Sequence, residues 1–236
     1  PESRRRKTAF FNTFQFITER TILMIQILFE DEWILVCLKP AGVLSEGNTP
    51  DSLPVLLAGQ WEKEIYPVHR LDRNTCGVMV FARRRDAAAA LCKSFSGEAG
   101  EKAAGKEYLA HIHGVPSPTE GEMRDLLYYD RMKNKVYPVS RMRRGVREAR
   151  LSYSLIRKEP DGTSWVKIRL GTGRTHQIRV QFATRKMPLV GDRRDGSPAP
   201  ESRVFLGAAE LSFPHPHTGA LLVFRDTEHI EAVYAE

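Results

Sequence analysis

The sequence predicts an α+β fold built on a mainly antiparallel, or mixed, sheet with flanking helices and loops. Two observations support this class. Short apolar runs typical of strands outnumber helical segments, and the two kinds of segment do not alternate regularly along the chain. Regular alternation would instead have indicated a doubly wound parallel sheet. Neither an internal repeat nor a low-complexity linker divides the chain.

Seven segments have the alternating or β-branched apolar pattern of strands. They are Trp33–Lys39, Gly77–Arg83, Lys106–Gly114, Leu151–Arg157, Ser164–Leu170, Val204–Phe213 and Ala220–Arg225. Three helices are predicted: Pro50–Gln60, the alanine-rich Arg85–Phe95, and a stretch from Thr175 in which Ile178 and Phe182 share one face. Pro40-Ala41-Gly42 and the pair Gly171 and Gly173 mark turns.

Length and composition suit one sizeable domain or two small subdomains. We expect a basic arm at residues 1–27, poorly ordered, followed by one folded domain at residues 28–236. Three widely spaced cysteines, Cys37, Cys76 and Cys92, fit a reducing cytosol better than a disulfide framework or a zinc site. The sequence contains no run of about 18 apolar residues, the length that would predict a membrane-spanning helix. We therefore expect a cytoplasmic protein, and a monomer.

The net charge of +7 favours a polyanionic partner, because Lys and Arg near phosphates release condensed counterions. Basic residues concentrate in Met132–Arg150, expected to be a loop, which includes Arg143 and Arg144. Tyrosines accompany them, and arginine planes and aromatic rings can stack on unpaired bases. We expect this stretch to contact RNA. The alternative is a solvated loop that only maintains solubility.

Four motifs occur in order along most of the chain. They are Lys39-Pro40-Ala41-Gly42, His69-Arg70-Leu71-Asp72 with Thr75-Cys76-Gly77, Lys106-Glu107-Tyr108, and Gly173-Arg174-Thr175-His176-Gln177-Ile178-Arg179. Together they resemble the RluA-type RNA pseudouridine synthases. That resemblance implies an isomerase that converts selected uridines in structured ribosomal or transfer RNA into pseudouridine. Such a reaction breaks the C1′–N1 bond and joins C5 to C1′, so it requires neither metal nor cofactor.

The resemblance makes residues 28–236 the expected catalytic domain, without the separate N-terminal RNA-binding domain that some relatives carry. It also implies roles for individual residues. Asp72 is the expected catalytic carboxylate; attack on the sugar, attack on the base and proton abstraction from C2′ all remain open. Tyr108 is expected to stack on the uracil, and Arg179 to pair with Asp72 and keep it charged. Arg70 is expected to fill the space left by the flipped nucleotide. The remaining motif residues are assigned to RNA binding or to loop orientation: His69, Thr75, Arg174, His176 and Gln177.

Two other functions stay open. One is an RNA-binding or ribosome-assembly protein with little catalysis, and the other is a nucleic-acid glycosylase, which shares the C1′ chemistry. The chain also departs from the family pattern at two positions. Cys76 stands where the family usually has Ser, and Asp195 stands where it often has Tyr.

Overall fold

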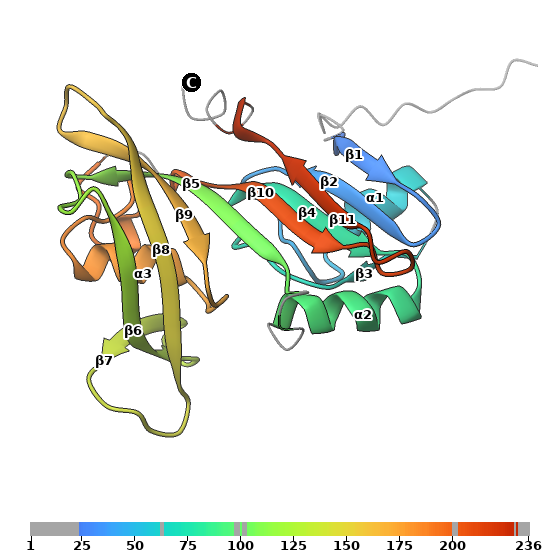
Figure 1. Ribbon diagram of the computed structural model, residues 1–236, viewed down its shortest axis with the longest axis horizontal. Helices are drawn as coiled ribbons and strands as arrows, with labels where there is room; N and C mark the ends of the chain where they lie inside the picture. Colours follow the sequence, from blue (N-terminus) through green and yellow to red (C-terminus); the bar gives the residue numbers. More distant parts are fainter. Residues whose placement is uncertain are drawn as a thin grey trace, which may run out of the picture.

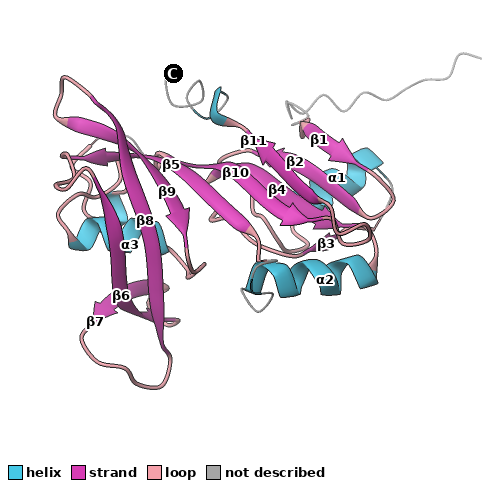
Figure 2. Cartoon of the chain, in the orientation of Figure 1, coloured by secondary structure: helices cyan, strands magenta, loops and turns pink. Residues whose placement is uncertain are grey.

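The computed structural model describes residues 24–61, 64–96, 100, 103–199, 203–228 and 230, which fold around one long mixed sheet (Figures 1 and 2). The strand order is β1-β2-β4-β10-β5-β9-β8-β6-β7, while β3 pairs with β4 and β11 pairs with β10. The strands are β1 (Ile27–Glu30), β2 (Ile34–Lys39), β3 (Tyr66–Pro67), β4 (Cys76–Ala82), β5 (Gly105–His113), β6 (Glu120–Asp130), β7 (Lys135–Val139), β8 (Val146–Lys158), β9 (Thr163–Leu170), β10 (Leu206–Pro214) and β11 (Leu221–Arg225). Only β4 and β10 pair in parallel among these described strands.

The helices cover opposite ends of this sheet. They are α1 (Leu53–Trp61), α2 (Arg85–Ser96) and α3 (Gln177–Thr184), with a short 3-10 turn at Arg193–Asp195. In Figure 1, α1 and α2 lie in the half that holds β1, β2 and β4, whereas α3 lies in the half that holds β6, β7 and β8. Strands β5 and β10 connect the two halves, and buried side chains from both halves join one hydrophobic core.

The α+β prediction is confirmed. Each of the ten predicted strands and helices matches an observed element, with ends displaced by no more than two residues except at the starts of β8 and α1. Strands β1, β3, β6 and β7 were missed. In β6, Asp125 lies between Met123 and Leu127 on the same face and interrupts the apolar alternation that marks a strand. The basic stretch Met132–Arg150 was also wrongly expected to be a single loop. It forms β7 and the first residues of β8, joined by short turns.

Gly77 explains how β4 enters the middle of the sheet. Its φ is +111°, a conformation that favours glycine, and a Cβ there would overlap the backbone of Ala208, 2.7 Å from its nitrogen. The missing side chain lets β4 and β10 approach in the parallel pair Gly77–Ala208. On its other side, Ala208 pairs with Tyr108 of β5. One backbone position of β10 therefore links two of the sequence motifs.

The proposed N-terminal arm lies largely outside the described residues. Packing begins before residue 28, because Ile25 is buried in the core and the carbonyl of Gln26 accepts a hydrogen bond from Leu38. In the described part of the chain, none of the helices has the length and apolar character needed to cross a membrane.

Candidate active site

The loop that carries Asp72 is held by the segment after β2. The ammonium of Lys39 is 1% exposed and donates to three backbone oxygens, those of Pro40, Arg73 and Thr75, at 2.8–3.0 Å. Gly42 N donates to the Arg73 carbonyl, and the Ser45 hydroxyl donates to the Leu71 carbonyl at 2.8 Å. Burial lowers the pKa of Lys39 to about 8. The two motifs Lys-Pro-Ala-Gly and His-Arg-Leu-Asp thus form one structural unit.

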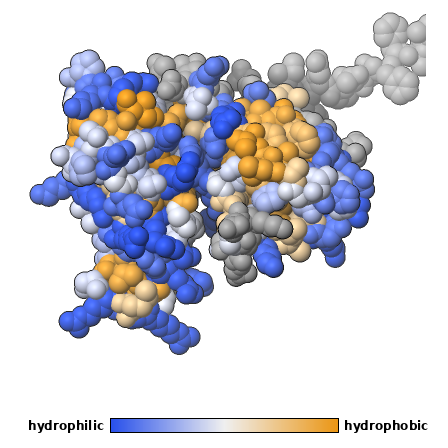
Figure 3. Space-filling model, viewed as in Figure 1, coloured by the Kyte–Doolittle hydropathy of each residue, from blue (hydrophilic) through white to orange (hydrophobic). Residues whose placement is uncertain are grey.

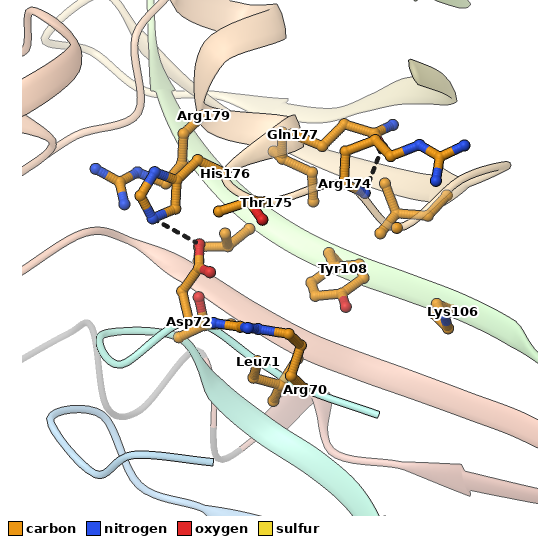
Figure 4. Close-up of a pocket in the computed structure, with 15 residues that line it drawn as sticks. Arg70, Leu71, Asp72, Lys106, Tyr108, Arg174, Thr175, His176, Gln177 and Arg179 are labelled. Carbon is orange, nitrogen blue, oxygen red and sulfur yellow. Dashed lines mark hydrogen bonds and ion pairs between the residues drawn. The ribbon is translucent and has the colours of Figure 1, made fainter. Parts of the chain in front are cut away.

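Tyr108 reaches the site from the middle of β5. Because side chains alternate along a strand, Lys106 and Tyr108 point to the same face, and both line the pocket beside Asp72 (Figure 4). The tyrosine is 8% exposed. Burial, with a smaller contribution from the Asp72 carboxylate, raises the pKa of its phenol. The phenol is therefore neutral near pH 7 and offers an apolar ring face to the pocket.

The loop between β9 and α3 supplies the opposite wall. Gln177 holds this loop: its side-chain oxygen accepts from Arg174 N at 3.0 Å and from the Thr172 hydroxyl at 2.8 Å, and its side-chain nitrogen donates to the Arg150 carbonyl. His176 precedes the helix with φ 50°, a left-handed conformation uncommon outside glycine. This turn directs its ring at Asp72, and the His176 Nε2 to Asp72 Oδ2 distance is 4.0 Å.

One pocket brings most of the expected site residues together. Of the residues assigned from the motifs, it is lined by Arg70, Asp72, Thr75, Tyr108, Arg174, His176, Gln177 and Arg179. Asp72 is the only carboxylate among the described residues of this lining, and its side chain is 22% exposed. Leu71, Leu170, Ile178 and Leu206 add apolar surface. The pocket therefore combines polar and apolar groups, and it holds one partly exposed carboxylate together with the ring of Tyr108.

The expected pairing of Arg179 with Asp72 is wrong in this structure. Arg179 donates to both carboxylate oxygens of Asp192, at 2.6 and 2.7 Å, and lies 3.3 Å from Asp195 Oδ2. Figure 4 shows its guanidinium turned away from Asp72. Two parallel hydrogen bonds to one carboxylate match the planar guanidinium, so Asp192 is a stronger partner for Arg179 than Asp72. Arg179 still acts on the site through charge, because it opposes protonation of His176.

His69 also differs from its assignment to RNA binding. Its ring stacks on Phe95 with centroids 4.4 Å apart, and its Nε2 accepts a hydrogen bond from the backbone N–H of Val80. Burial lowers the pKa of His69 to about 3, so the ring is neutral. It is absent from the lining of the pocket. His69 therefore orients the start of the Asp72 loop. Gln177 likewise lines the pocket but uses its amide within its own loop.

Arg143 and Arg144 lie away from the pocket, on the turn between β7 and β8 at the tip of a projecting hairpin (Figure 1). The Arg143 guanidinium lies over the ring of Tyr128, 5.3 Å from its centroid. Both side chains are exposed. The structure leaves their assignment to RNA contact as a prediction.

Sequence reasoning missed three positions. Lys39 and Lys106 belonged to recognised motifs but received no role; strand alternation with Tyr108 was the signal available for Lys106. The pair Gly191-Asp192 resembles the family pattern only weakly, and the contact of Asp192 with Arg179 could not be derived from it, because that contact joins residues on different elements. No group of three or more His, Cys, Asp and Glu side chains arranged to hold a metal ion occurs among the described residues.

Comparison with known proteins identifies the family. Residues 33–184 match the family model described as RNA pseudouridylate synthase. The chain belongs to the RNA pseudouridine synthase family. This family consists of isomerases, and the match covers the Asp72 loop, Tyr108 and the Gly173–Arg179 motif.

Relatives with curated names agree with this pseudouridine synthase assignment. The dual-specificity RNA pseudouridine synthase RluA of Escherichia coli K12 is 33% identical over 84% of this chain and 91% of that protein. The ribosomal large subunit pseudouridine synthase C of Buchnera aphidicola is 30% identical over 84% of this chain. This chain spans 65% of the Buchnera protein's length.

Solved structures show the same fold. Human RNA pseudouridylate synthase domain containing 1 superposes with a TM-score of 0.72 at 20% identity, covering 89% of this chain and 86% of that one. Human RNA pseudouridylate synthase domain containing 4 gives a TM-score of 0.68 at 23% identity, with 89% and 92% covered. The predicted resemblance to RluA-type enzymes is confirmed.

Proposed function

We propose that this protein isomerises uridine to pseudouridine in structured RNA, with Asp72 as the catalytic carboxylate. The observation that carries the proposal is the composition of the pocket: the one carboxylate of its described lining, that of Asp72, is partly exposed and shares the pocket with the buried ring of Tyr108. Breaking the C1′–N1 bond leaves C1′ electron-poor, as in glycoside chemistry, where a carboxylate stabilises or attacks that centre. The other pocket residues are cationic, polar or apolar and suit a flipped base.

The remaining pocket residues have distinct proposed roles. The neutral Tyr108 ring supports the uracil, and its phenol can relay the C5 proton only by accepting that proton as it gives up its own. Arg70 extends from the same loop as Asp72 and pairs with the exposed Glu46 at 2.8 Å. An exposed ion pair contributes little energy, so an RNA phosphate or base can replace Glu46 at low cost. Arg70 is therefore free to enter the RNA as the uridine leaves its stack.

Arg179 acts on the catalytic carboxylate indirectly in this proposal. It is anchored by Asp192, and its charge lies beside His176, the nearest partner of Asp72. Burial lowers the pKa of His176, although Asp72 partly opposes this, so the imidazole is neutral near pH 7. A neutral His176 forms no ion pair with Asp72, which keeps the carboxylate available to the sugar or the base.

The proposed substrate is a stem-loop of ribosomal or transfer RNA. One relative is named for the ribosomal large subunit and another for dual specificity toward RNA. The net charge of +7 agrees with a polyanionic substrate. RNA is recognised largely by shape and by unstacked bases, so a folded loop suits a site that must extrude its target.

Pseudouridine mapping tests the proposal. Total RNA from cells lacking the gene is incubated with the purified protein or with Asp72→Asn, and pseudouridines are located by chemical labelling and primer extension. We expect one or a few sites to be modified by the wild-type protein and none by Asp72→Asn. The variant should bind RNA within about tenfold of wild type, because the carboxylate supplies chemistry and not phosphate contact. Near-normal turnover by Asp72→Asn would refute the assignment.

The same incubation separates the two competing functions. A glycosylase would release free uracil, which chromatography of the soluble fraction detects, whereas an isomerase releases none. A complementation experiment tests the other alternative. If the protein acted by binding RNA with little catalysis, the wild-type gene and the Asp72→Asn gene would rescue a gene-deletion phenotype equally well. We expect only the wild-type gene to rescue it.

A further inference from the structure

Two further pockets adjoin the Asp72 pocket, one beside strands β6 and β7 and the other beside Asp192 and Arg193. One shares Arg174 and Thr175 with it, and the other shares Arg70, Asp72 and Thr175. Tyr129 lines both flanking pockets but not the central one. The binding surface therefore continues beyond the space for a single base, and Tyr129 stands where the two extensions meet.

The fold leaves Tyr129 uncovered. It lies on β6 two residues after Leu127, and so on the same face of the strand. Leu127 is buried in a cluster with Val180 of α3. Tyr129 lies beyond the cover of that helix, next to Thr175 in the loop before it, and is 38% exposed. An exposed aromatic ring at the rim of a pocket is available to a ligand.

The ring of Tyr129 is held at one end and is partly exposed. Its hydroxyl donates to the side-chain oxygen of Asn134 at 2.8 Å. Its neighbours are already occupied, since Arg143 lies over Tyr128 and Lys135 lies over Tyr137. Within the described ranges, neither an aromatic ring nor a cation stacks on Tyr129. A held ring with open faces loses little conformational entropy when a ligand stacks on it.

Cationic side chains flank this ring. Arg147 and Arg174 line the pocket on one side, while Arg70 and Arg193 line the pocket on the other. Figure 3 shows hydrophilic residues surrounding a small apolar patch on the projecting hairpin of β6, β7 and β8. Cations spaced around an open aromatic ring match a nucleic-acid strand, in which phosphates alternate with bases.

We propose that Tyr129 is a stacking platform for an unpaired nucleotide next to the target uridine. The inference rests on the proposed function and adds a recognition residue to it. Stacking on a ring is tolerant of base identity, so Tyr129 selects RNA in which a neighbour of the uridine is free of a pair. The platform thereby favours loop uridines over helical ones.

Two substitutions separate stacking from a structural role. Tyr129→Phe keeps the ring and removes the hydrogen bond to Asn134, whereas Tyr129→Leu removes the ring and keeps apolar bulk. If Tyr129 only held the turn before β7 through its hydroxyl, Tyr129→Phe would weaken RNA binding as much as Tyr129→Leu. Tyr66→Leu is the matched control, because the hydroxyl of this tyrosine on β3 also donates to a side chain, that of Glu64, but Tyr66 lies outside the Met132–Arg150 stretch and lines neither pocket.

The binding test uses a short oligouridylate that carries one 2-aminopurine, whose fluorescence is quenched when it stacks on a ring. We expect Tyr129→Leu to weaken binding by about 5- to 100-fold and to remove the quenching, as loss of one base–aromatic stack does. Tyr129→Phe and Tyr66→Leu should stay within about threefold of wild type. Equal binding by wild type and Tyr129→Leu, or equal loss in Phe and Leu, would overturn the proposal.

The activity test uses RNA from cells that lack the gene. We expect Tyr129→Leu to raise KM and leave kcat nearly unchanged, because stacking of a neighbour stabilises ground state and transition state alike. The two proposals fail separately. Full turnover by Asp72→Asn removes the catalytic assignment and leaves the platform intact. Wild-type KM and wild-type quenching by Tyr129→Leu remove the platform and leave the catalytic assignment intact.

Discussion

Replacing Gly77 by alanine should damage both stability and catalysis. The backbone conformation at φ +111° costs an L-residue about 1–3 kcal/mol. The new Cβ would also overlap the backbone of Ala208, which cannot move aside as a flexible side chain can; overpacking of this kind costs about 1–3 kcal/mol. The sum is a loss of about 2–6 kcal/mol in the free energy of unfolding.

The catalytic effect follows from the position of Ala208. It pairs with Gly77 on one side and with Tyr108 on the other, so relief of the overlap changes the placement of Asp72 relative to Tyr108. A misplacement of about 1 Å can lower the rate by about a hundredfold. We therefore expect kcat/KM to fall by a similar factor in folded Gly77→Ala protein.

Gly42→Ala is the matched control for this prediction. Gly42 also has a positive φ, +87°, but a Cβ there would meet nothing within 4 Å. It should lose only the backbone contribution, about 1–3 kcal/mol. Urea unfolding of the three proteins gives the free energies, and an unchanged m-value shows that the comparison is valid. Equal losses in Gly77→Ala and Gly42→Ala would refute the argument that close approach of β4 and β10 requires glycine.

Three further predictions concern charged residues. Burial lowers the pKa of Lys39 from 10.5 to about 8, so the unfolded chain binds more protons than the native one between these two pH values. The free energy of unfolding of the wild type should therefore rise with pH across this window, relative to that of Lys39→Met, by on the order of 3 kcal/mol. A flat difference in urea titrations would contradict this. Asp192→Asn leaves the buried Arg179 without its bidentate partner, so we expect a loss of about 3–5 kcal/mol by urea unfolding and a lower kcat; unchanged values of both would show that the pair has no role. Neutralising Arg143 and Arg144 should weaken RNA binding and reduce the slope of log affinity against log salt by about 1–2, measured by filter binding, and an unchanged slope would exclude them from the interface.

Sequence determined the chemistry of this protein and most of its elements. Local apolar periodicity identified the strands and helices whose faces are regularly buried, because that period is a property of neighbouring residues. It failed for β6, where a hairpin projecting from the body buries too few side chains to show alternation. The four motifs pointed to Asp72 and Tyr108 as the proposed catalytic residues, and both line one pocket in the structure.

Only the tertiary structure decided which groups touch. The partner of Arg179 is Asp192 and not Asp72, and His69 faces Phe95 and Val80 instead of the pocket. Leu127 is buried because α3 packs over it, whereas Tyr129, two residues later, lies beyond the helix and is partly exposed. These contacts join residues from different elements, so their energies depend on sheet order and helix placement, which no local pattern in the sequence contains.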